Sequence, residues 1–385
     1  MKTVALIYGG ESGEHDVSCV SAGYLEQTIA AAGFTAVAVY ISRKGEWHRQ
    51  PRVATLAAEN VQNPSSLLQK NGRVVLTSAT EETAIDFAFP IVHGTAGEDG
   101  SLQGFFEVLG LAYAGSGVAT SAVCMDKALM RALFAVNQIP QVEYFVIADA
   151  ESADSEKIHA RIESSFGYPV FIKPCNMGSS VGVHKVSGRD ALAKAIEDAA
   201  RFDDHLLCEQ GLPVRELEIA IAGNFPDYLI SGVGEIKVNH DFYSYEAKYL
   251  DPNGADLFLE APIEPALREE IQRLAKAAYA AVRGEGFARV DFFLHKETGA
   301  LYLNEINTLP GFTRSACFHN SSGQPGSMAQ RSLAKLLNGA RPAATGSSGC
   351  ARRAGLNGRG KSSTLHAFIP LFFAARCTQP SRTFS

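Results

Sequence analysis

Residues 1–32 of this 385-residue chain read MKTVALIYGGESGEHDVSCVSAGYLEQTIAAA. Val4 to Tyr8 is a continuous apolar run of the kind found in buried parallel strands. Two glycines break the run, and Val17 to Ala32 then has the apolar spacing of a helix. A second apolar run, Ala36 to Ile41, follows. This order predicts a βαβ unit at the start of a doubly wound domain.

The rest of the chain predicts an α/β and α+β protein whose N-terminal domain carries a doubly wound parallel sheet. Period-2 and period-3.6 apolar patterns predict the remaining elements. We expect strands at 86–92, 169–174, 180–186, 206–209, 218–222, 228–237, 288–294 and 300–306, and helices at 97–110, 127–136, 189–201 and 266–283. Residues 238–256 have no period, and a loop of this length inside a compact domain is usually functional.

Composition excludes several classes of protein. Hydrophobic residues make up 46% and charged residues 20% of the chain, as in ordinary globular proteins. The net charge of -6 gives no reason to expect nucleic-acid binding. The seven cysteines form no C-x-x-C pair, which argues against a zinc cage or a disulfide framework. No apolar run is long enough for a signal peptide or a membrane span, so we expect a cytoplasmic protein without membrane contact.

The glycine turn GGESGEHDVS (9–18) follows the first strand. A helix N-terminus reached through glycines favours anions and carboxylates. Glu14 and Asp16 therefore either stabilise the helix terminus, or Glu14 faces the crevice at the end of the strand and binds an ammonium group.

The loop IKPCNMGSSVGV (172–183) places Lys173 at a strand end before a glycine and two serines. Backbone donors and a lysine are suited to a flap over a triphosphate. The alternative is a surface hairpin with a solvated lysine.

The most specific pattern is ARVDFFL (288–294) followed by LYLNEINTLPG (301–311). Strand alternation puts Arg289 and Asp291 on one face, and Glu305 with Asn307 on one face of the next strand. If the strands pair, Asp291, Glu305 and Asn307 form an all-oxygen ligand set suited to Mg²⁺, and Arg289 can neutralise a phosphoryl group. The alternative is the polar face of an amphipathic sheet.

Three further residues carry weaker signals. His93 follows a strand, where a histidine is either structural or catalytic. Lys248 and Tyr249 lie in the long loop, which could act as a lid.

These motifs, in this order, resemble the D-alanine–D-alanine ligases of the ATP-grasp superfamily. The matching stretches are GGESGEHDVS, HGTAGEDGSLQGFFEVLGLAYAGSGV, SAVCMDK, YPVFIKPCNMGSSVGVHKV, CEQGLPVRELEIAI, FYSYEAKYL, ARVDFFL and NEINTLPGFT, within residues 1–313. The resemblance implies an N-terminal substrate-binding domain (1–123), a central ATP-grasp domain (124–213) and a C-terminal ATP-grasp domain with the metal site (214–313). ATP would lie between the last two.

The resemblance also implies site residues. ATP would be bound by Lys127, Lys173, Glu209 at the adenine amino group, Gln210, Glu216 at the ribose, and Lys248 near the γ-phosphate. The metal ligands would be Asp291, Glu305 and Asn307. The catalytic set would be Glu14 on the ammonium of the first D-alanine, Ser179 linking it to Tyr249, His93 beside that substrate's carboxylate, and Arg289 with the Gly311 amide as oxyanion stabilisers.

The implied reaction has two steps. ATP, the co-substrate, phosphorylates the carboxylate of one D-alanine, and the amine of a second D-alanine displaces phosphate. Two Mg²⁺ ions, which Mn²⁺ can replace, would assist, and the product would serve peptidoglycan synthesis. The expected partners are D-alanine and ATP, with a homodimer implied by resemblance alone. Tyr249 favours the dipeptide over D-alanyl-D-lactate; another ATP-grasp carboxylate–amine ligase and an inactive nucleotide-binding remnant stay open as alternatives.

The last 72 residues depart from the family pattern. All 41 acidic residues lie in 1–313, whereas residues 314–385 hold ten Lys and Arg and no acid. Ala316 stands where the family has a serine that binds the second substrate's carboxylate. We therefore expect this tail to be translated out of frame, which resequencing of the gene tests.

Overall fold

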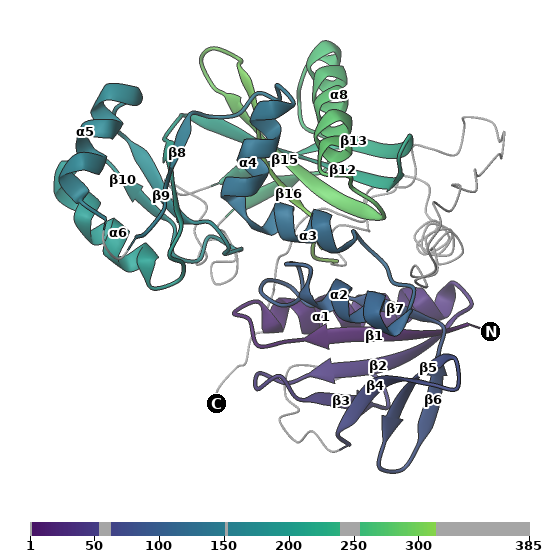
Figure 1. The fold of residues 1–385 in the computed structure, drawn as a ribbon. Coiled ribbons are helices and arrows are strands. Elements are labelled where there is room, and N and C mark those ends of the chain that lie inside the picture. The colour runs from purple at the N-terminus through teal and green to yellow at the C-terminus, as the bar shows by residue number, and fades with distance from the viewer. Residues whose placement is uncertain (1, 54–62, 151–152, 239–254, 313–385) are drawn as a thin grey trace, which may run out of the picture.

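A computed structural model describes residues 2–53, 63–150, 153–238 and 255–312 (Figure 1). These residues form four β-sheets, and three of them have helices packed against them. The expected loop at 238–256 lies mostly outside the described residues, and everything after Phe312 lies wholly outside them.

The N-terminal part is built on a four-stranded sheet of order β3-β2-β1-β7. Its elements are β1 (Thr3–Gly9), α1 (His15–Ala31), β2 (Thr35–Ile41), β3 (Trp47–Gln50), β7 (Phe87–Pro90) and α2 (Ser101–Leu109). β1 pairs in parallel with β2 and β7, which confirms the predicted βαβ unit. Gly9 has a φ of +94°, and a Cβ there would lie 2.2 Å from the Ile41 carbonyl oxygen, so only glycine fits this turn.

Helices cover both faces of this sheet. Leu6 and Tyr8 pack on α1 residues such as Leu25, while Ile7 packs with Phe106 of α2 on the other face. A three-stranded antiparallel sheet also lies against the second face, and its strands are β4 (Ser65–Lys70), β5 (Arg73–Ser78) and β6 (Glu82–Ile85). The domain is therefore doubly wound, as expected.

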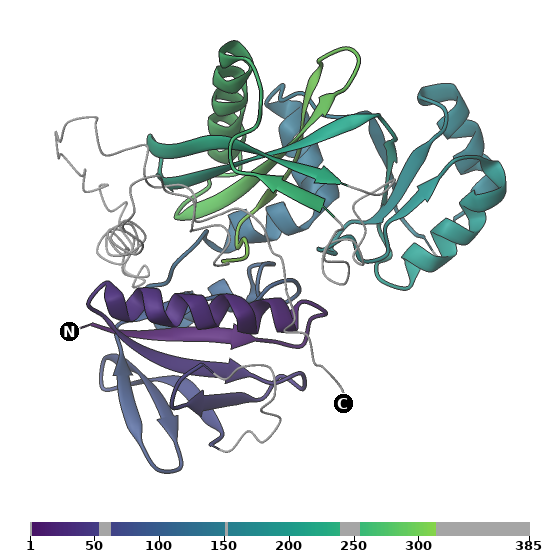
Figure 2. The same ribbon diagram turned by 180° about the vertical axis from the view of Figure 1, so that it is seen from behind.

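The second unit is a four-stranded sheet of order β10-β9-β11-β8, which Figures 1 and 2 show beside the third sheet. Its elements are β8 (Tyr144–Ile147), α5 (Ser155–Ser165), β9 (Val170–Pro174), β10 (His184–Val186), η1 (Arg189–Ala191), α6 (Leu192–Ala200) and β11 (Leu206–Gln210). Ile162 of α5 and Ile196 of α6 share a core with Ile172 of β9. The predicted hairpin around the Gly/Ser loop is confirmed by antiparallel pairing of β9 with β10.

The third unit is a five-stranded antiparallel sheet of order β14-β13-β12-β15-β16. Its strands are β12 (Val214–Asn224), β13 (Asp227–Val238), β14 (Ala255–Phe258), β15 (Phe287–His295) and β16 (Leu301–Asn307), and α8 (Pro265–Ala281) covers it. The helices α3 (Val118–Met125) and α4 (Lys127–Val136) precede the second sheet in sequence, yet Met130 and Phe134 pack into the core of the third.

The structure corrects the prediction in two respects. The N-terminal sheet is mixed rather than purely parallel, because β3 pairs antiparallel to β2 at its edge. The elements β3 to β6, α3, β8, α5 and β14 were not predicted. β4 to β6 are short and rich in polar residues, so they lack the long apolar runs that identified β1 and β2.

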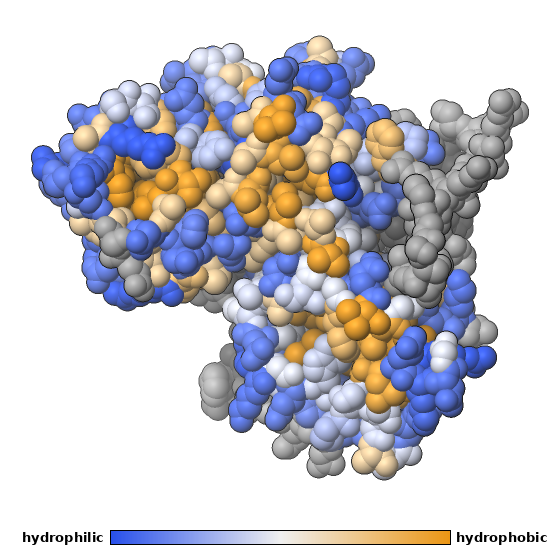
Figure 3. All heavy atoms as spheres, viewed as in Figure 1, coloured by the Kyte–Doolittle hydropathy of each residue, from blue (hydrophilic) through white to orange (hydrophobic). Residues whose placement is uncertain are grey.

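Apolar side chains gather over α2 and α4 on the face shown in Figure 3. Their exposed members include Phe105, Val108, Leu129 and Val136. Within the described residues no helix is both long and apolar enough to cross a bilayer.

Candidate active site

A cavity of about 950 Å³ lies between the second and third sheets. Ten of the expected site residues line it: Lys127, Lys173, Ser179, Glu209, Gln210, Glu216, Arg289, Asp291, Glu305 and Asn307. Residues that are far apart in the sequence thus meet at one site. Lys248 and Tyr249 lie outside the described residues.

The predicted oxygen ligands come together on β15 and β16. Asp291 pairs directly with Glu305 in the antiparallel register, and Arg289 pairs with Asn307. The Asn307 Nδ2 donates to Asp291 Oδ2 at 2.9 Å. Arg289, Asp291 and Phe293 of β15 line the cavity, while the even-numbered residues of this strand are buried in the core that α8 covers, as the alternation predicts.

Arg289 lies within this group of carboxylates. Its Nε and Nη2 donate to the two oxygens of Asp291, both at 2.7 Å. Its Nε also lies 3.1 Å from Glu218 Oε2. Burial alone would lower the pKa of this guanidinium, but Asp291 and Glu218 outweigh it and raise the pKa well above its usual value. Arg289 is therefore a fixed positive charge.

Sequence reasoning missed Glu218, which also lines the cavity. It pairs with Asp291 across β12 and β15, and its side chain is buried. Burial raises its pKa to about 8, although Arg289 acts in the opposite direction. Its position in RELEIAI, two residues after Glu216 and hence on the same strand face, was the signal available.

The side chains at this end of the cavity fit a hard divalent cation. Asp291 and Glu305 supply carboxylate oxygens and Asn307 an amide oxygen, which are ligand types that Mg²⁺ and Mn²⁺ accept. Three carboxylates, counting Glu218, surround one arginine, so the group has a surplus of negative charge when ionised. Both the donor chemistry and the charge suit a cation.

At the other end of the cavity, Glu209 on β11 forms ion pairs with two cationic side chains. Lys173 contacts its Oε1 and Arg131 its Oε2. Burial would raise the pKa of Glu209, but Lys173 and Arg131 together lower it. Arg131 was also missed; it lies four residues after Lys127 on α4, a spacing that puts both on one helix face.

The loop between β9 and β10 lies over the cavity and is anchored at its start. Lys127 Nζ donates to the Met177 carbonyl oxygen at 2.6 Å. Asp203 Oδ2 accepts from the backbone N and the Nδ2 of Asn176, at 2.6 and 3.0 Å. Ser179 and Ser180 have φ values of +50° and +60°, a conformation that non-glycine residues adopt rarely outside tight or functional turns.

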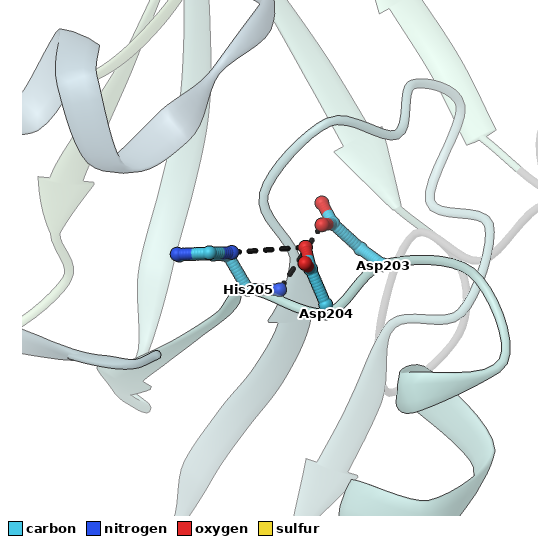
Figure 4. Close-up of side chains that lie close together, drawn as sticks. All are labelled: Asp203, Asp204 and His205. Carbon is cyan, nitrogen blue, oxygen red and sulfur yellow. Dashed lines mark hydrogen bonds and ion pairs between the residues drawn. The ribbon is translucent and has the colours of Figure 1, made fainter. Parts of the chain in front are cut away.

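Asp203, Asp204 and His205 form the one cluster, within the described ranges, of three His, Cys, Asp or Glu side chains whose ligand atoms lie within 4.8 Å of one another (Figure 4). Asp203 Oδ1 also accepts from the His205 backbone N at 3.0 Å, and His205 Nδ1 lies 2.9 Å from Asp204 Oδ1. The Asp203 carboxylate already accepts hydrogen bonds from the backbone N–H groups of Asn176 and His205, so we interpret this cluster as an anchor for the loop.

Glu14 connects the first part of the chain with this loop. It occupies the N-cap position of α1 without a side-chain capping bond in the described structure. Its carboxylate instead accepts a hydrogen bond from Ser179 Oγ. A Cβ on Gly94 or Gly178 would lie 3.1 or 3.0 Å from Glu14 Oε2, so two glycines leave room for this carboxylate. The contact favours the binding interpretation of Glu14 over helix capping.

His93 is buried next to Glu14 and Glu98. Its Nδ1 lies 3.0 Å from the Leu309 carbonyl oxygen and 3.5 Å from Glu98 Oε1. Nε2 is buried and has no hydrogen-bond partner among the described residues. Burial alone would lower the pKa of His93, but Glu98 and then Glu14 raise it. The arrangement suits a cationic histidine that offers Nε2–H to an anion.

Gly311 is buried near the end of the described chain and does not line the cavity. The next residue, Phe312, packs against Phe89 and Phe287, and its N–H donates to Ser21 Oγ at 3.2 Å. This packing fixes the path of the chain after Asn307.

Comparison with known proteins gives the same result along most of the chain. Residues 3–116 match the family model described as D-ala D-ala ligase N-terminus, and residues 133–338 match D-ala D-ala ligase C-terminus. The second match extends past Thr313, where the motif resemblance ended.

Relatives and solved structures agree with the family models. D-alanine–D-alanine ligase A of Bradyrhizobium diazoefficiens is 42% identical over 325 residues, covering 80% of this chain and 87% of that protein. A D-alanine–D-alanine ligase of Thermoanaerobacter is 37% identical, covering 88% and 96%. The D-alanine–D-alanine ligase structure from Coxiella burnetii superposes with a TM-score of 0.75 at 30% identity, covering 87% of this chain and 93% of that one.

The VanG D-Ala:D-Ser ligase of Enterococcus faecalis gives a TM-score of 0.75 at 29% identity, covering 87% and 99%. The cavity between two sheets, its oxygen and lysine side chains, and both family models together place this chain in the D-alanine–D-alanine ligase family, with the ATP-grasp fold.

Proposed function

We propose that this protein joins two D-alanines into D-alanyl-D-alanine, converting ATP to ADP and phosphate. The observation that carries the proposal is the single cavity in which Asp291, Glu305 and Asn307 meet the lysines of the second sheet. The Glu14–Ser179 contact places Glu14, the proposed ligand of the first substrate's ammonium group, beside the loop between β9 and β10. Family membership supports the same reaction.

ATP is expected to lie between the second and third sheets. Glu209 accepts from the adenine amino group, Gln210 lies beside it, and Glu216 binds the ribose. Lys127 and Lys173 contact phosphates, and Lys248 the γ-phosphate. The Lys127–Met177 bond supports a role for Lys127 in holding the loop over the nucleotide as well.

The first D-alanine is bound through opposite charges. Glu14 takes its ammonium group, and Ser179, which contacts Glu14, links this position to Tyr249. His93 offers its Nε2 to the substrate carboxylate. Two groups of opposite sign then set the orientation of a zwitterion, and a reversed orientation would place like charges together.

In the first step a carboxylate oxygen of this D-alanine bonds to the γ-phosphorus, and the bond to the bridging oxygen breaks, which releases ADP. In the second step the amine of the other D-alanine attacks the acyl carbon and loses a proton, and phosphate leaves. Arg289 and the Gly311 amide stabilise the oxyanion. No protein nucleophile is needed because ATP activates the carboxylate.

Asp291, Glu305 and Asn307 are the residues that would hold two Mg²⁺ or Mn²⁺ ions. When bound, these ions neutralise charge on the transferred phosphoryl group. Glu218 and Arg289 lie directly beside this ligand set.

We assign the synthesis to the cytoplasm, where ATP is available, as a step of peptidoglycan synthesis. The domain bounds 1–123, 124–213 and 214–313 are kept as part of the proposal. A homodimer is also proposed, and the exposed Phe105 and Val108 of α2 offer an apolar surface for a second copy. Light scattering of the purified protein tests the dimer.

The proposal is tested by phosphate release from ATP with D-alanine, D-serine, L-alanine or D-lactate as the amino or hydroxy acid. D-alanine alone should give efficient release with a matching amount of dipeptide. D-serine is included because a neighbouring fold is a D-Ala:D-Ser ligase. Phosphate release only when D-serine or D-lactate accompanies D-alanine would show that the product is D-alanyl-D-serine or D-alanyl-D-lactate and contradict the proposed dipeptide.

A further inference from the structure

Arg131 is a buried arginine that does not face the cavity. It is 2% exposed, and it is absent from the cavity lining that includes its partner Glu209. Its Nη2 contacts Glu209 Oε2 and lies 3.5 Å from Asn304 Oδ1, and its guanidinium lies 5.6 Å from the centre of the Tyr144 ring. Any effect of Arg131 on a bound molecule must therefore pass through a neighbour.

A contribution to the stability of the fold does not explain why an arginine is buried at position 131. Its Nε and Nη1 have no hydrogen-bond partner within the part of the chain that is described. Buried donors without partners are costly, and an apolar side chain in place of a buried ion pair is often as stable or more stable. The feature that Arg131 does account for is the charge state of Glu209.

Three charged groups face Glu209 from different elements. Lys173 from β9 and Arg131 from α4 favour its ionised form, whereas Glu305 from β16 opposes it. In the proposed complex Lys173 contacts a phosphate, which weakens its hold on Glu209. Arg131 is then the cation that still pairs with the Glu209 carboxylate.

The charge state of Glu209 decides which base it can bind. An ionised carboxylate only accepts hydrogen bonds, whereas a neutral carboxylic acid also donates. Adenine presents an amino donor at C6, and guanine presents a carbonyl acceptor at the same position. An ionised Glu209 therefore selects adenine, and a neutral one can also bind guanine.

We propose that Arg131 is a specificity-determining positioning residue, which keeps Glu209 an acceptor and so selects adenine over guanine nucleotides. This inference rests on the proposed role of Glu209 at the adenine amino group. It concerns base selection and is independent of the amino-acid chemistry.

The test is calorimetric binding of ADP and GDP to the full-length chain and its variants between pH 6 and 9. The wild type should prefer ADP at least 100-fold, Arg131→Leu should lose at least tenfold of that preference at pH 7, and Arg131→Lys should stay within threefold of wild type. In Arg131→Leu the preference should return as pH rises and Glu209 ionises. Arg161→Leu, which removes an arginine lying 4.1 Å over the Phe145 ring, is the matched control.

An unchanged preference in Arg131→Leu, equal losses in the leucine and lysine variants, or a loss that does not vary with pH would overturn the inference. If the leucine variant does not fold, Glu209→Gln replaces it. That neutral amide should relax the preference at every pH, and retention of full preference would be contrary to the inference. Absence of D-alanine-dependent phosphate release with base preference intact would instead contradict the proposed ligase function alone.

Discussion

Asp291 is the carboxylate to which the neighbouring side chains of the proposed metal site are bonded. It lies opposite Glu305, binds Arg289 through both oxygens and accepts from Asn307. The proposed metal ligands and the arginine that is proposed to stabilise the oxyanion thus share one carboxylate. Arg289 also lies 3.1 Å from Glu218, whose pKa Asp291 helps to raise, so Glu218 ionises more readily when the Asp291 charge is engaged by a cation.

We predict that Asp291→Asn lowers kcat about 100-fold or more, the scale expected when a preorganised electrostatic contact to the reacting group is lost. The melting temperature should change little, because Asp291 helps to raise the pKa of Glu218, and loss of the Asp291 charge favours an ionised Glu218 that pairs with Arg289. Steady-state phosphate release and thermal melting measure the two effects. Glu270→Gln, on the exposed surface of α8, is the control. Activity within threefold of wild type would be incompatible with a metal-ligand role.

His93 and Glu98 give a second prediction, which concerns pH. The raised pKa of His93 means that the folded protein holds a proton that the unfolded chain releases near pH 6.5. This stabilisation is complete below about pH 6.5 and is lost as pH rises through the folded-state pKa. The raised pKa of Glu98, caused by burial, also makes stability fall with rising pH.

The free energy of unfolding of the wild type should therefore decrease between pH 6.5 and pH 9 in urea titrations. The double variant His93→Gln with Glu98→Gln should show a flatter profile over this window. Equal slopes for the two proteins would show that the pair does not titrate as a unit.

At the scale of elements, the loop between β9 and β10 is held in place by side chains from other elements. Asp203, next to β11, binds the loop through Asn176, and Lys127 binds it through Met177. Its two left-handed serines restrict the backbone further. The loop thus brings Ser179 of the second unit into contact with Glu14, which precedes α1 in the N-terminal part.

Asp203→Ala should free about one loop residue, at a cost of about 1 to 2 kcal/mol, and so raise the KM for ATP about 5- to 30-fold with kcat within twofold. Asp204→Ala is the matched control, because that carboxylate lies beside the His205 ring rather than on Asn176. Initial-rate kinetics separate the two parameters. Equal KM values for the two variants would rule out anchoring by Asp203.

Elements with strong apolar patterns were predictable, and the weakly patterned ones were not. The alternation in ARVDFFL was enough to predict which face of β15 carries Arg289 and Asp291. Glu218 and Arg131 were missed because a charged residue in a buried strand or helix resembles an exposed one until its partner is known. The partner of Glu218 comes from the neighbouring strand β15 and that of Arg131 from β11 of the second sheet, and the periodicity of a single element contains no such information.

At the scale of the whole molecule, the described residues bring three separate units around one cavity. Phe312, at the end of the described chain, packs with Phe89 of the first sheet and Phe287 of the third. The sequence from 314 onward holds no acid, and the resemblance implies that Ala316 stands where the family has the serine that binds the second substrate. We therefore expect the tail to weaken binding of the second D-alanine more than binding of ATP.

We predict that replacing residues 314–385 by a family-like ending raises ligase turnover strongly and lowers the KM for the second D-alanine, while affinity for ADP changes less than threefold. Initial rates and calorimetry on both proteins give the comparison. Full activity of the natural chain, with no gain from the new ending, would show that the tail is compatible with catalysis.

The most direct test of the central claim is a single assay of the purified protein, with its own tail and with the family-like ending, in ATP and Mg²⁺. Phosphate and D-alanyl-D-alanine are quantified together with and without D-alanine. We predict one phosphate for each dipeptide, strict dependence on D-alanine, and loss of both products in EDTA. Phosphate release without dipeptide, or no response to D-alanine from either protein, would contradict the account.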